Sequence, residues 1–362
     1  MLAPVAGGAE GLTHALDRFA GRWSKMRDLA PDKLSELRRV ATIESVGSST
    51  RIEGAALSDR EVAAVLGGLT VDGFRARDEE EVRGYGDLLE MVFAGYERMR
   101  VSESTVKSLH HALLRHSRKD ARHRGDYKTA PNHVEATYPD GRRVVVFSTA
   151  PPAQTRWWMS RLIDEFNAAW RSERWHPLVL TADFVLWFLA IHPFQDGNGR
   201  LSRALTTLLL LKAGYDYVPY ASLERVIEDN KAAYYAALRA SQVTVVQEPA
   251  QYRDWLEFFF RCLRTQQDTL AATLDRALQQ SSLIPVQERI LDVVRSRGPQ
   301  TSTALATALG ISQRTVRYHL MRLTQAGRLT APPRRAGRLY SLPLEPPQAG
   351  PLARARGRRG GL

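Results

Sequence analysis

The chain has 362 residues, of which 44% are hydrophobic and 25% charged, and its formal net charge is +12. This length and composition predict a soluble, globular protein of two or three domains. No apolar run approaches the roughly 18 residues of a membrane span, and the single cysteine, Cys262, excludes a disulfide framework and a cysteine-based zinc site. Because the N-terminus lacks the basic region of a signal peptide, we expect a cytoplasmic protein without a membrane partner.

Helical spacing of apolar residues dominates the chain up to about residue 280 and predicts an all-α body. The first helix is expected over about 32–54, where Gly54 ends it. Two β-prone runs flank a Pro-Asp-Gly turn and predict a hairpin over 134–147. Further amphipathic helices are expected over 78–99, 102–117, 153–171, 177–191, 200–213 and 230–240, with one or two more over 251–280.

The positive charge is concentrated at the C-terminal end. Residues 285–345 hold ten Arg and three acidic residues, and the tail 346–362 holds four Arg and no acidic residue. We therefore expect any polyanion-binding function there. The domains that we predict are an N-terminal helical region, a core, a small C-terminal domain and a disordered basic tail, with bounds 1–100, 101–280, 285–345 and 346–362.

The most informative segment is the loop between the helices predicted over 177–191 and 200–213. It begins at His192 and contains Gly197 and Gly199. Backbone N–H groups at the start of a helix lack carbonyl partners within that helix, and glycines leave room for a ligand to approach them. The loop is therefore a candidate phosphate site.

Side chains around this loop supply the other groups that phosphate chemistry needs. Asp196 offers a carboxylate to Mg²⁺, which usually takes one or two carboxylates together with phosphate oxygens. Arg200 and Arg203 are three residues apart on one helix face and can neutralise the same anion. His192 offers a base. Together these groups predict phosphoryl or nucleotidyl transfer.

Residues 192–200, His-Pro-Phe-Gln-Asp-Gly-Asn-Gly-Arg, followed by Arg203, resemble the Fic family motif His-Pro-Phe-x-Asp/Glu-Gly-Asn-Gly/Lys-Arg with its second arginine. Residues 49–54, Ser-Thr-Arg-Ile-Glu-Gly, resemble the family's inhibitory motif Ser/Thr-x-x-x-Glu-Gly/Asn, and residues 125–128, Gly-Asp-Tyr-Lys, are similar to the segment that leads into the family's flap. The similarity covers about residues 20–260 and implies a Fic-type helical bundle with the hairpin as its flap.

The resemblance implies a protein adenylyltransferase, which transfers AMP from ATP to a Ser, Thr or Tyr hydroxyl of a protein target or of itself. His192 would be the general base, Asp196 would hold Mg²⁺, and Phe194 would be a buried anchor of the loop. The edge of the flap would pair with an extended segment of the target. The phosphates of ATP would be bound by Gly197, Asn198 (backbone and side chain), Gly199, Arg200 and Arg203.

The resemblance also implies autoinhibition. The Glu53 carboxylate would form a pair with Arg203, which we expect to be bidentate, and Ser49, one helical turn earlier, would add a hydrogen bond. Phosphate-transferring relatives have Lys where this chain has Gly199, which favours AMP transfer. Transfer of phosphocholine and removal of AMP stay open as alternatives.

The small C-terminal domain looks like a winged helix-turn-helix. A short helix over 302–309 ends at Gly310, Ser312 is expected to cap the next helix, and β-prone runs at about 328–341 predict the wing. The module could instead bind protein, or the chain could be a DNA-binding regulator that carries a Fic core. Whether a homodimer forms stays open. The residues expected to contact DNA are Arg314, Arg317, Arg322, Arg334 and Arg335.

Overall fold

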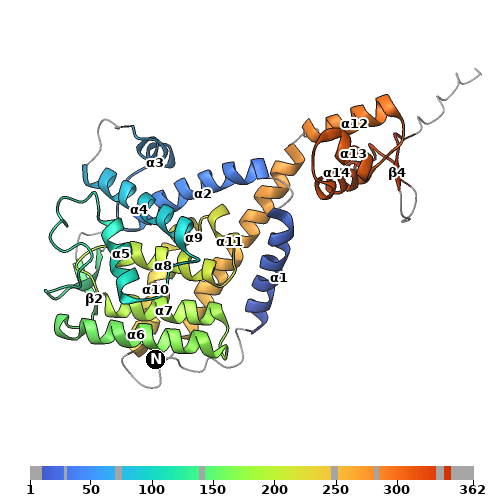
Figure 1. Cartoon of the computed structure of the whole chain (residues 1–362). Helices are drawn as coiled ribbons and strands as arrows, with labels where there is room; N and C mark the ends of the chain where they lie inside the picture. The colour runs from blue at the N-terminus through green and yellow to red at the C-terminus, as the bar shows by residue number, and fades with distance from the viewer. Residues whose placement is uncertain are drawn as a thin grey trace, which may run out of the picture. The chain divides into compact units, whose positions relative to one another are not determined.

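The computed structural model describes residues 10–27, 31–69, 76–137, 143–245, 252–280, 285–331 and 338–343, and the chain divides into two compact units, Met1–Leu274 and Asp275–Leu362. The predicted all-α class is confirmed (Figure 1). Among the described residues, no helix is long and apolar enough to cross a membrane. The first elements are α1 (Glu10–Arg27), α2 (Pro31–Ile52), α3 (Asp59–Leu66), α4 (Ala76–Gly95), α5 (Glu103–Leu113), β1 (His133–Thr137), β2 (Arg143–Ser148) and α6 (Pro152–Ser172).

The chain continues through two central helices and then toward the second unit. These elements are α7 (Pro177–Ile191), α8 (Asn198–Lys212), the 3-10 helix η1 (Val218–Tyr220), α9 (Leu223–Asp229), α10 (Lys231–Val245) and α11 (Arg253–Gln280). The second unit contains α12 (Pro285–Arg297), β3 (Gln300–Thr301), α13 (Ser302–Leu309), α14 (Gln313–Gln325) and β4 (Leu339–Tyr340).

Helices α7 and α8 form the centre of the first unit. Nearly every side chain of both is buried. The sequence of α7 is apolar all round, whereas α8 also buries polar side chains, among them Arg200 and Arg203. Figure 1 shows α8 with α4 on one side and with α7 and then α6 on the other. The loop between α7 and α8 is therefore held at both ends by fully buried helices.

Helix α2 crosses this centre and contacts α4, α8 and α9. Its end agrees with the sequence, since Ile52 is its last residue and Gly54 follows with a φ of 101°. The last turns bury small polar side chains beside Ile52, and Thr50 donates its hydroxyl hydrogen to the carbonyl oxygens of Val46 and Gly47. A polar helix end can be buried here because these hydroxyls find partners.

Several helix boundaries differ from the prediction. Helix α5 ends at Leu113 rather than 117, because the Arg124 guanidinium binds the carbonyl oxygens of Arg115 and Ser117 and folds the following segment into turns. Helices α1, α3 and α9 were not predicted. For α3 a signal existed, since Ser58 and Glu61 form a capping box at its start.

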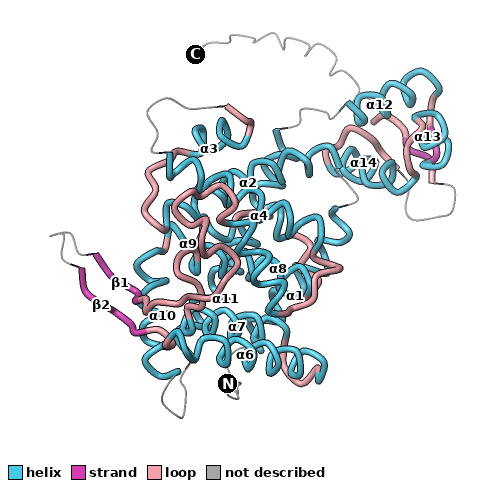
Figure 2. The backbone as a smooth tube through the Cα atoms, turned by 60° about the vertical axis from the view of Figure 1, so that its left-hand side comes forward, coloured by secondary structure: helices cyan, strands magenta, loops and turns pink. Residues whose placement is uncertain are grey.

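Strands β1 and β2 pair antiparallel from His133 with Ser148 to Thr137 with Arg143, and this confirms the predicted hairpin. Its turn, 138–142, lies outside the described residues. Figure 2 shows the hairpin projecting from the helical body. At its base the Thr149 hydroxyl donates to the Asn132 carbonyl oxygen at 3.0 Å, which joins the ends of the two strands.

The second unit has its own hydrophobic core, which includes Leu305 from α13 and Leu320 from α14. Ser312 caps α14, as predicted, by accepting a hydrogen bond from the Thr315 N–H at 3.1 Å. Strands β3 and β4 pair antiparallel, and Thr330 bridges to Ser341 as expected for the base of a wing. The wing tip lies outside the described residues, and with it the predicted DNA contacts Arg334 and Arg335.

Candidate active site

His192 ends α7 in the left-handed conformation, with φ 53° and ψ 60°, which is unusual for a residue other than glycine. Its Nδ1 lies 3.3 Å from the Leu189 carbonyl oxygen. Because a carbonyl oxygen can only accept, Nδ1 carries the hydrogen and donates it. In the neutral ring Nε2 then carries a lone pair. Burial lowers the pKa of His192 to about 4, so the ring is neutral at physiological pH. A neutral imidazole with an available acceptor nitrogen is what a general base requires.

The Asn198 side chain closes the loop on itself. Its Oδ1 accepts from the Phe194 N–H at 2.9 Å, and its Nδ2 donates to the Phe194 carbonyl oxygen at 2.7 Å. The Asn198 amide is buried and shapes the loop in this structure, and its contact with phosphates stays a prediction. The Phe194 side chain is fully buried, which confirms it as an anchor.

His110 is a residue that the sequence analysis missed. Its ring is fully buried and stacks on Phe194 with the ring centroids 3.7 Å apart. Its Nδ1 accepts from the Gly125 N–H at 2.8 Å, and its Nε2–H donates to the Asp196 carbonyl oxygen at 3.0 Å. Burial lowers the pKa of His110 to about 4, so this ring too is neutral. The available signal was its place on the apolar face of α5, four residues after Val106.

The base of the hairpin is bonded to the same loop. The Lys128 N–H donates to the Pro193 carbonyl oxygen at 2.9 Å, and the Lys128 ammonium donates to the Ile191 carbonyl oxygen at 3.1 Å. The Asn132 Nδ2 donates to the carbonyl oxygens of Phe194 and His192 at 2.7 and 3.3 Å. Residues 125–128, which resemble the family's segment before the flap, thus connect the hairpin to the loop.

Asp196 lies among cations at the start of α8. Its carboxylate accepts from the Gly197 N–H at 2.6 Å, from Arg200 Nη2 at 3.1 Å and from Lys119 Nζ at 2.8 Å. Burial raises the pKa of this carboxyl, but Arg200 and Lys119 lower it more, to about 2. Arg200, whose side chain is 3% exposed, also faces Glu81 at 3.4 Å. Lys119 and Glu81 are site residues that the sequence analysis did not identify.

The donor set around Asp196 fits Mg²⁺ shared with a nucleotide. Asp196 is ionised, and no group of three or more His, Cys, Asp or Glu side chains suited to a metal occurs among the described residues. Mg²⁺ in phosphate-transferring sites takes one or two carboxylates and completes its shell with phosphate oxygens and water. One carboxylate beside a phosphate site is therefore sufficient.

Arg203 is held by the end of α2. Its Nε donates to the Ser49 hydroxyl at 2.9 Å, and its Nη2 donates to the Ser49 carbonyl oxygen at 3.0 Å and to Glu53 Oε1 at 2.8 Å. The predicted pair exists, but it is not bidentate, because Ser49 binds the Nε–Nη2 edge of the guanidinium and Glu53 is bonded only to Nη2. Burial raises the pKa of Glu53, yet Arg203 and Arg200 lower it more, so the carboxyl stays ionised.

Glu53 also lies against Gly199. The space that a Cβ on Gly199 would fill is occupied by Oε1 of Glu53, and Arg203 Nη1 is 3.4 Å from it. Arg200 and Arg203 were expected to neutralise one anion. In this structure each arginine is paired with different acids. Arg200 faces Asp196 and Glu81, whereas Arg203 faces Glu53.

Comparisons with known proteins agree with these features. Residues 100–210 match the Fic/DOC family, and residues 285–327 match a helix-turn-helix domain. The chain contains a Fic/DOC domain. Protein adenylyltransferase Fic of Drosophila willistoni is 25% identical over 278 residues, which are 76% of this chain and 51% of that protein. The chain thus spans about half the length of the curated relatives that it matches.

Solved structures share the fold. A Fic family protein from Desulfovibrio desulfuricans is 23% identical with a TM-score of 0.60, over 99% of this chain and 98% of that one. A Fic domain containing signaling protein from Bacteroides thetaiotaomicron is 24% identical with a TM-score of 0.57, over 71% and 98%. The match to the Fic/DOC family includes His110 and the loop but ends short of α2, so the role of α2 depends on its own contacts.

The second unit presents a basic surface on α14. Arg314 and Arg317 are exposed, while Val316 and Leu320 of the same helix are buried in the core. Arg322, also expected to contact DNA, is half-buried and donates to the Tyr318 hydroxyl at 3.2 Å. The helix thus turns Arg314 and Arg317 to solvent and holds Arg322 against its own surface.

Proposed function

We propose that this protein is a protein adenylyltransferase that transfers AMP from ATP to a Ser, Thr or Tyr hydroxyl of a protein target or of itself. The observation that carries the proposal is His192, a neutral imidazole with an acceptor nitrogen at the start of the candidate phosphate-binding loop. Support also comes from the relatives named protein adenylyltransferase, with which the chain shares the Fic domain.

In the proposed reaction, His192 Nε2 accepts the proton of the target hydroxyl as its oxygen attacks the α-phosphorus of ATP. The new oxygen–phosphorus bond forms while the bond from the α-phosphorus to the bridging oxygen breaks, and pyrophosphate leaves with the electron pair. Backbone N–H groups of Gly197 to Gly199 would hold phosphate oxygens. Arg200 and Arg203 would neutralise the charge that develops on the leaving pyrophosphate.

Asp196 is the residue that would hold Mg²⁺. When bound, the ion would neutralise phosphate oxygens and stabilise the leaving group. In the described structure Arg200 and Lys119 neutralise the same carboxylate. These cations keep Asp196 ionised and hold it at the start of α8, ready to act as a ligand.

We further propose that Glu53 keeps this enzyme inactive. It pairs with Arg203, whose side chain is only 4% exposed, and it places a negative charge beside Gly199. Both effects disfavour a terminal phosphate of ATP at the start of α8, the first by occupying its cation and the second by repulsion. ATP bound in another orientation would not present its α-phosphorus for in-line attack.

Labelled ATP tests the transferred group directly. The Glu53→Gly variant should incorporate label into protein from α-labelled ATP and not from γ-labelled ATP, because AMP retains only the α-phosphorus. The matched control is Glu97→Gly, at an exposed carboxylate in the turn that follows α4. Label from γ-labelled ATP would instead indicate phosphate transfer, and label from neither in a folded variant would contradict the proposal.

A second candidate function is DNA binding by the second unit, favoured by exposed Arg314 and Arg317 on α14. Under this reading the chain is a transcriptional regulator in the cytoplasm. The full chain should bind duplex DNA more weakly as salt rises. Arg317→Ala should make the slope of log K against log salt shallower by about the amount that corresponds to one phosphate contact. Salt-independent binding, or none at low salt, would indicate a protein-interaction module.

A further inference from the structure

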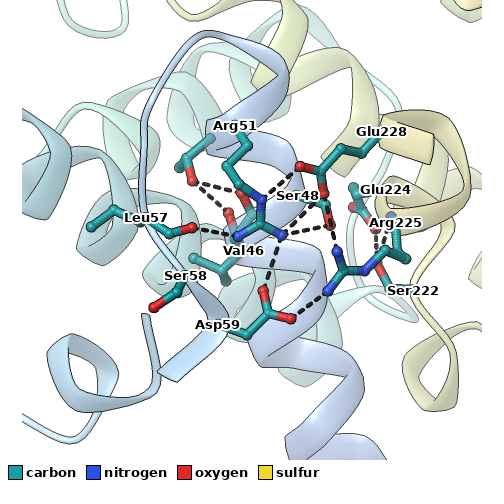
Figure 3. A network of polar contacts seen from close by, with 12 residues as sticks. Val46, Ser48, Arg51, Leu57, Ser58, Asp59, Ser222, Glu224, Arg225 and Glu228 are labelled. Atoms are coloured by element: carbon teal, nitrogen blue, oxygen red, sulfur yellow. Dashed lines mark hydrogen bonds and ion pairs between the residues drawn. The ribbon is translucent and has the colours of Figure 1, made fainter. Parts of the chain in front are cut away.

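A set of charged residues contacts the end of α2 (Figure 3). Arg51 Nε donates to Glu228 Oε1 at 2.6 Å, and its Nη2 donates to Glu228 Oε2 at 3.0 Å, so this pair is bidentate. Arg51 Nη2 also lies 3.0 Å from Asp59 Oδ1. Arg225 pairs with both acids, Asp59 and Glu228. We call Arg51, Asp59, Arg225 and Glu228 the α2 clamp.

The clamp ties together three separate parts of the first unit. Arg51 belongs to α2, Asp59 begins α3, and Arg225 and Glu228 lie on α9. Arg51 Nη1 also donates to the Leu57 carbonyl oxygen at 2.7 Å, which folds the segment after α2 back onto the helix. The clamp therefore fixes where α2 ends and how the chain leaves it.

Gly47 leaves the space that the clamp needs. A Cβ at this position would lie 2.7 Å from Arg51 Nη1 and 2.9 Å from Asp59 Oδ1, closer than real Cβ contacts. Glycine inside a helix is disfavoured by about 0.5–1 kcal/mol relative to alanine. Gly47 therefore makes room for the Arg51 guanidinium and lowers the helix propensity of α2.

Glu53 depends on this arrangement. It follows the last residue of α2, and its backbone N–H bonds to the Thr50 carbonyl oxygen at 3.1 Å. Arg51, two residues earlier, is pulled toward α9, while Ser49 and Glu53 face Arg203. Building on the proposed function, we propose that the α2 clamp is a positioning device that holds Glu53 against Arg203 and so sets the strength of the inhibition.

The exposure of the clamp makes the inhibition sensitive to salt. Its side chains are 17% to 36% exposed, and those of the Glu53–Arg203 pair are 33% and 4% exposed. Salt screens partly exposed charges more strongly than buried ones. Salt should therefore loosen the clamp as well as the Glu53–Arg203 pair.

The test compares Glu228→Gln with the control Asp229→Asn, the neighbouring exposed acid outside the clamp. Glu228→Gln should raise AMP incorporation about threefold to tenfold, roughly the effect of weakening one partly buried ion pair, while Asp229→Asn should leave it unchanged. In a Glu53→Gly background, Glu228→Gln should add nothing, because it acts through Glu53. A gain that adds to Glu53→Gly, or no gain in the wild-type background, overturns the proposal.

A second variant and a second readout separate this proposal from the proposed function. Gly47→Ala favours the helix but displaces Arg51, so it should also raise AMP incorporation, unlike a variant that merely destabilises the protein. Both clamp variants should speed hydrogen exchange of the amides at 48–57. If exchange speeds up but neither they nor Glu53→Gly transfer AMP, the proposed function fails, and of the clamp proposal only the hold on the end of α2 stands. If Glu53→Gly is active while exchange and activity of the clamp variants match wild type, the clamp proposal fails.

Discussion

The loop at 192–197 precedes α8, and the end of α2 contacts the same helix through Arg203. The two segments are held in place by different kinds of interaction. Neutral, fully buried groups hold the loop, chiefly the His110 ring and the amide of Asn198. Ion pairs between partly exposed side chains hold the end of α2, such as Arg51 with Glu228. Lys128, which is bonded to the loop, is charged, but burial lowers its pKa to about 8.

This difference separates contacts that stay fixed from contacts that salt or a competing charge can weaken. Buried neutral hydrogen bonds are costly to break, because each unsatisfied group keeps its desolvation cost. Partly exposed ion pairs contribute less, and salt or a competing charge weakens them. In the proposed enzyme, the backbone of the loop is therefore held by the first kind, and the segment that we propose must be displaced for activity is held by the second.

The largest expected effect is at His192. Its side chain makes one long hydrogen bond within α7, so His192→Ala should leave the loop intact and remove only the base. We expect AMP transfer by the Glu53→Gly, His192→Ala double variant to fall about 10²–10⁴-fold relative to Glu53→Gly, while the Kd for ATP stays within a factor of about two. Transfer at the parent rate would show that His192 is not the base.

The next effect is at Glu53. Glu53→Gly should raise AMP incorporation, including self-modification, by one to several orders of magnitude, at tenfold for each 1.4 kcal/mol. Ser49→Ala should raise it less, because the Ser49 carbonyl oxygen still binds Arg203. Adding Arg203→Ala to Glu53→Gly should silence the enzyme again. An active Glu53→Gly, Arg203→Ala variant would rule out inhibition through Arg203.

A smaller effect should follow from loosening the loop. His110→Phe keeps the stacking area on Phe194 but removes both hydrogen bonds of the ring, to Gly125 and to the Asp196 carbonyl. In the Glu53→Gly background we expect about a tenfold lower kcat and a lower Tm, since small displacements of reacting groups are costly. The control is His111→Phe at the exposed neighbour. Equal effects of the two variants would contradict the positioning role of His110.

The smallest expected effect is that of mild acid. A base works when it is unprotonated, and because the pKa of His192 is lowered to about 4, its neutral form persists well below pH 6. The kcat/KM of Glu53→Gly should therefore be flat from about pH 8 to 5.5, whereas an ordinary histidine would lose about tenfold by pH 5.5. A tenfold loss there would contradict a buried, neutral His192.

The sequence by itself determined the elements whose cause is local. Helical spacing of apolar residues placed α7 and α8 and the loop between them, Gly54 placed the end of α2, and a Pro-Asp-Gly turn placed the hairpin. The loop's resemblance to the Fic motif identified His192, Asp196 and the arginines, because that motif is contiguous in the chain.

Only the tertiary structure decided the partners. Arg51 and Glu228 are 177 residues apart, and His110 reaches the Asp196 carbonyl across 86 residues. Such pairs leave no local pattern, because each side chain taken alone resembles a solvated charge or a core residue. For the same reason the sequence did not show that Arg203 Nε binds Ser49 and leaves Glu53 only Nη2. The packing of α2 on α8 fixes which acceptor meets which donor, and spacing along one helix does not.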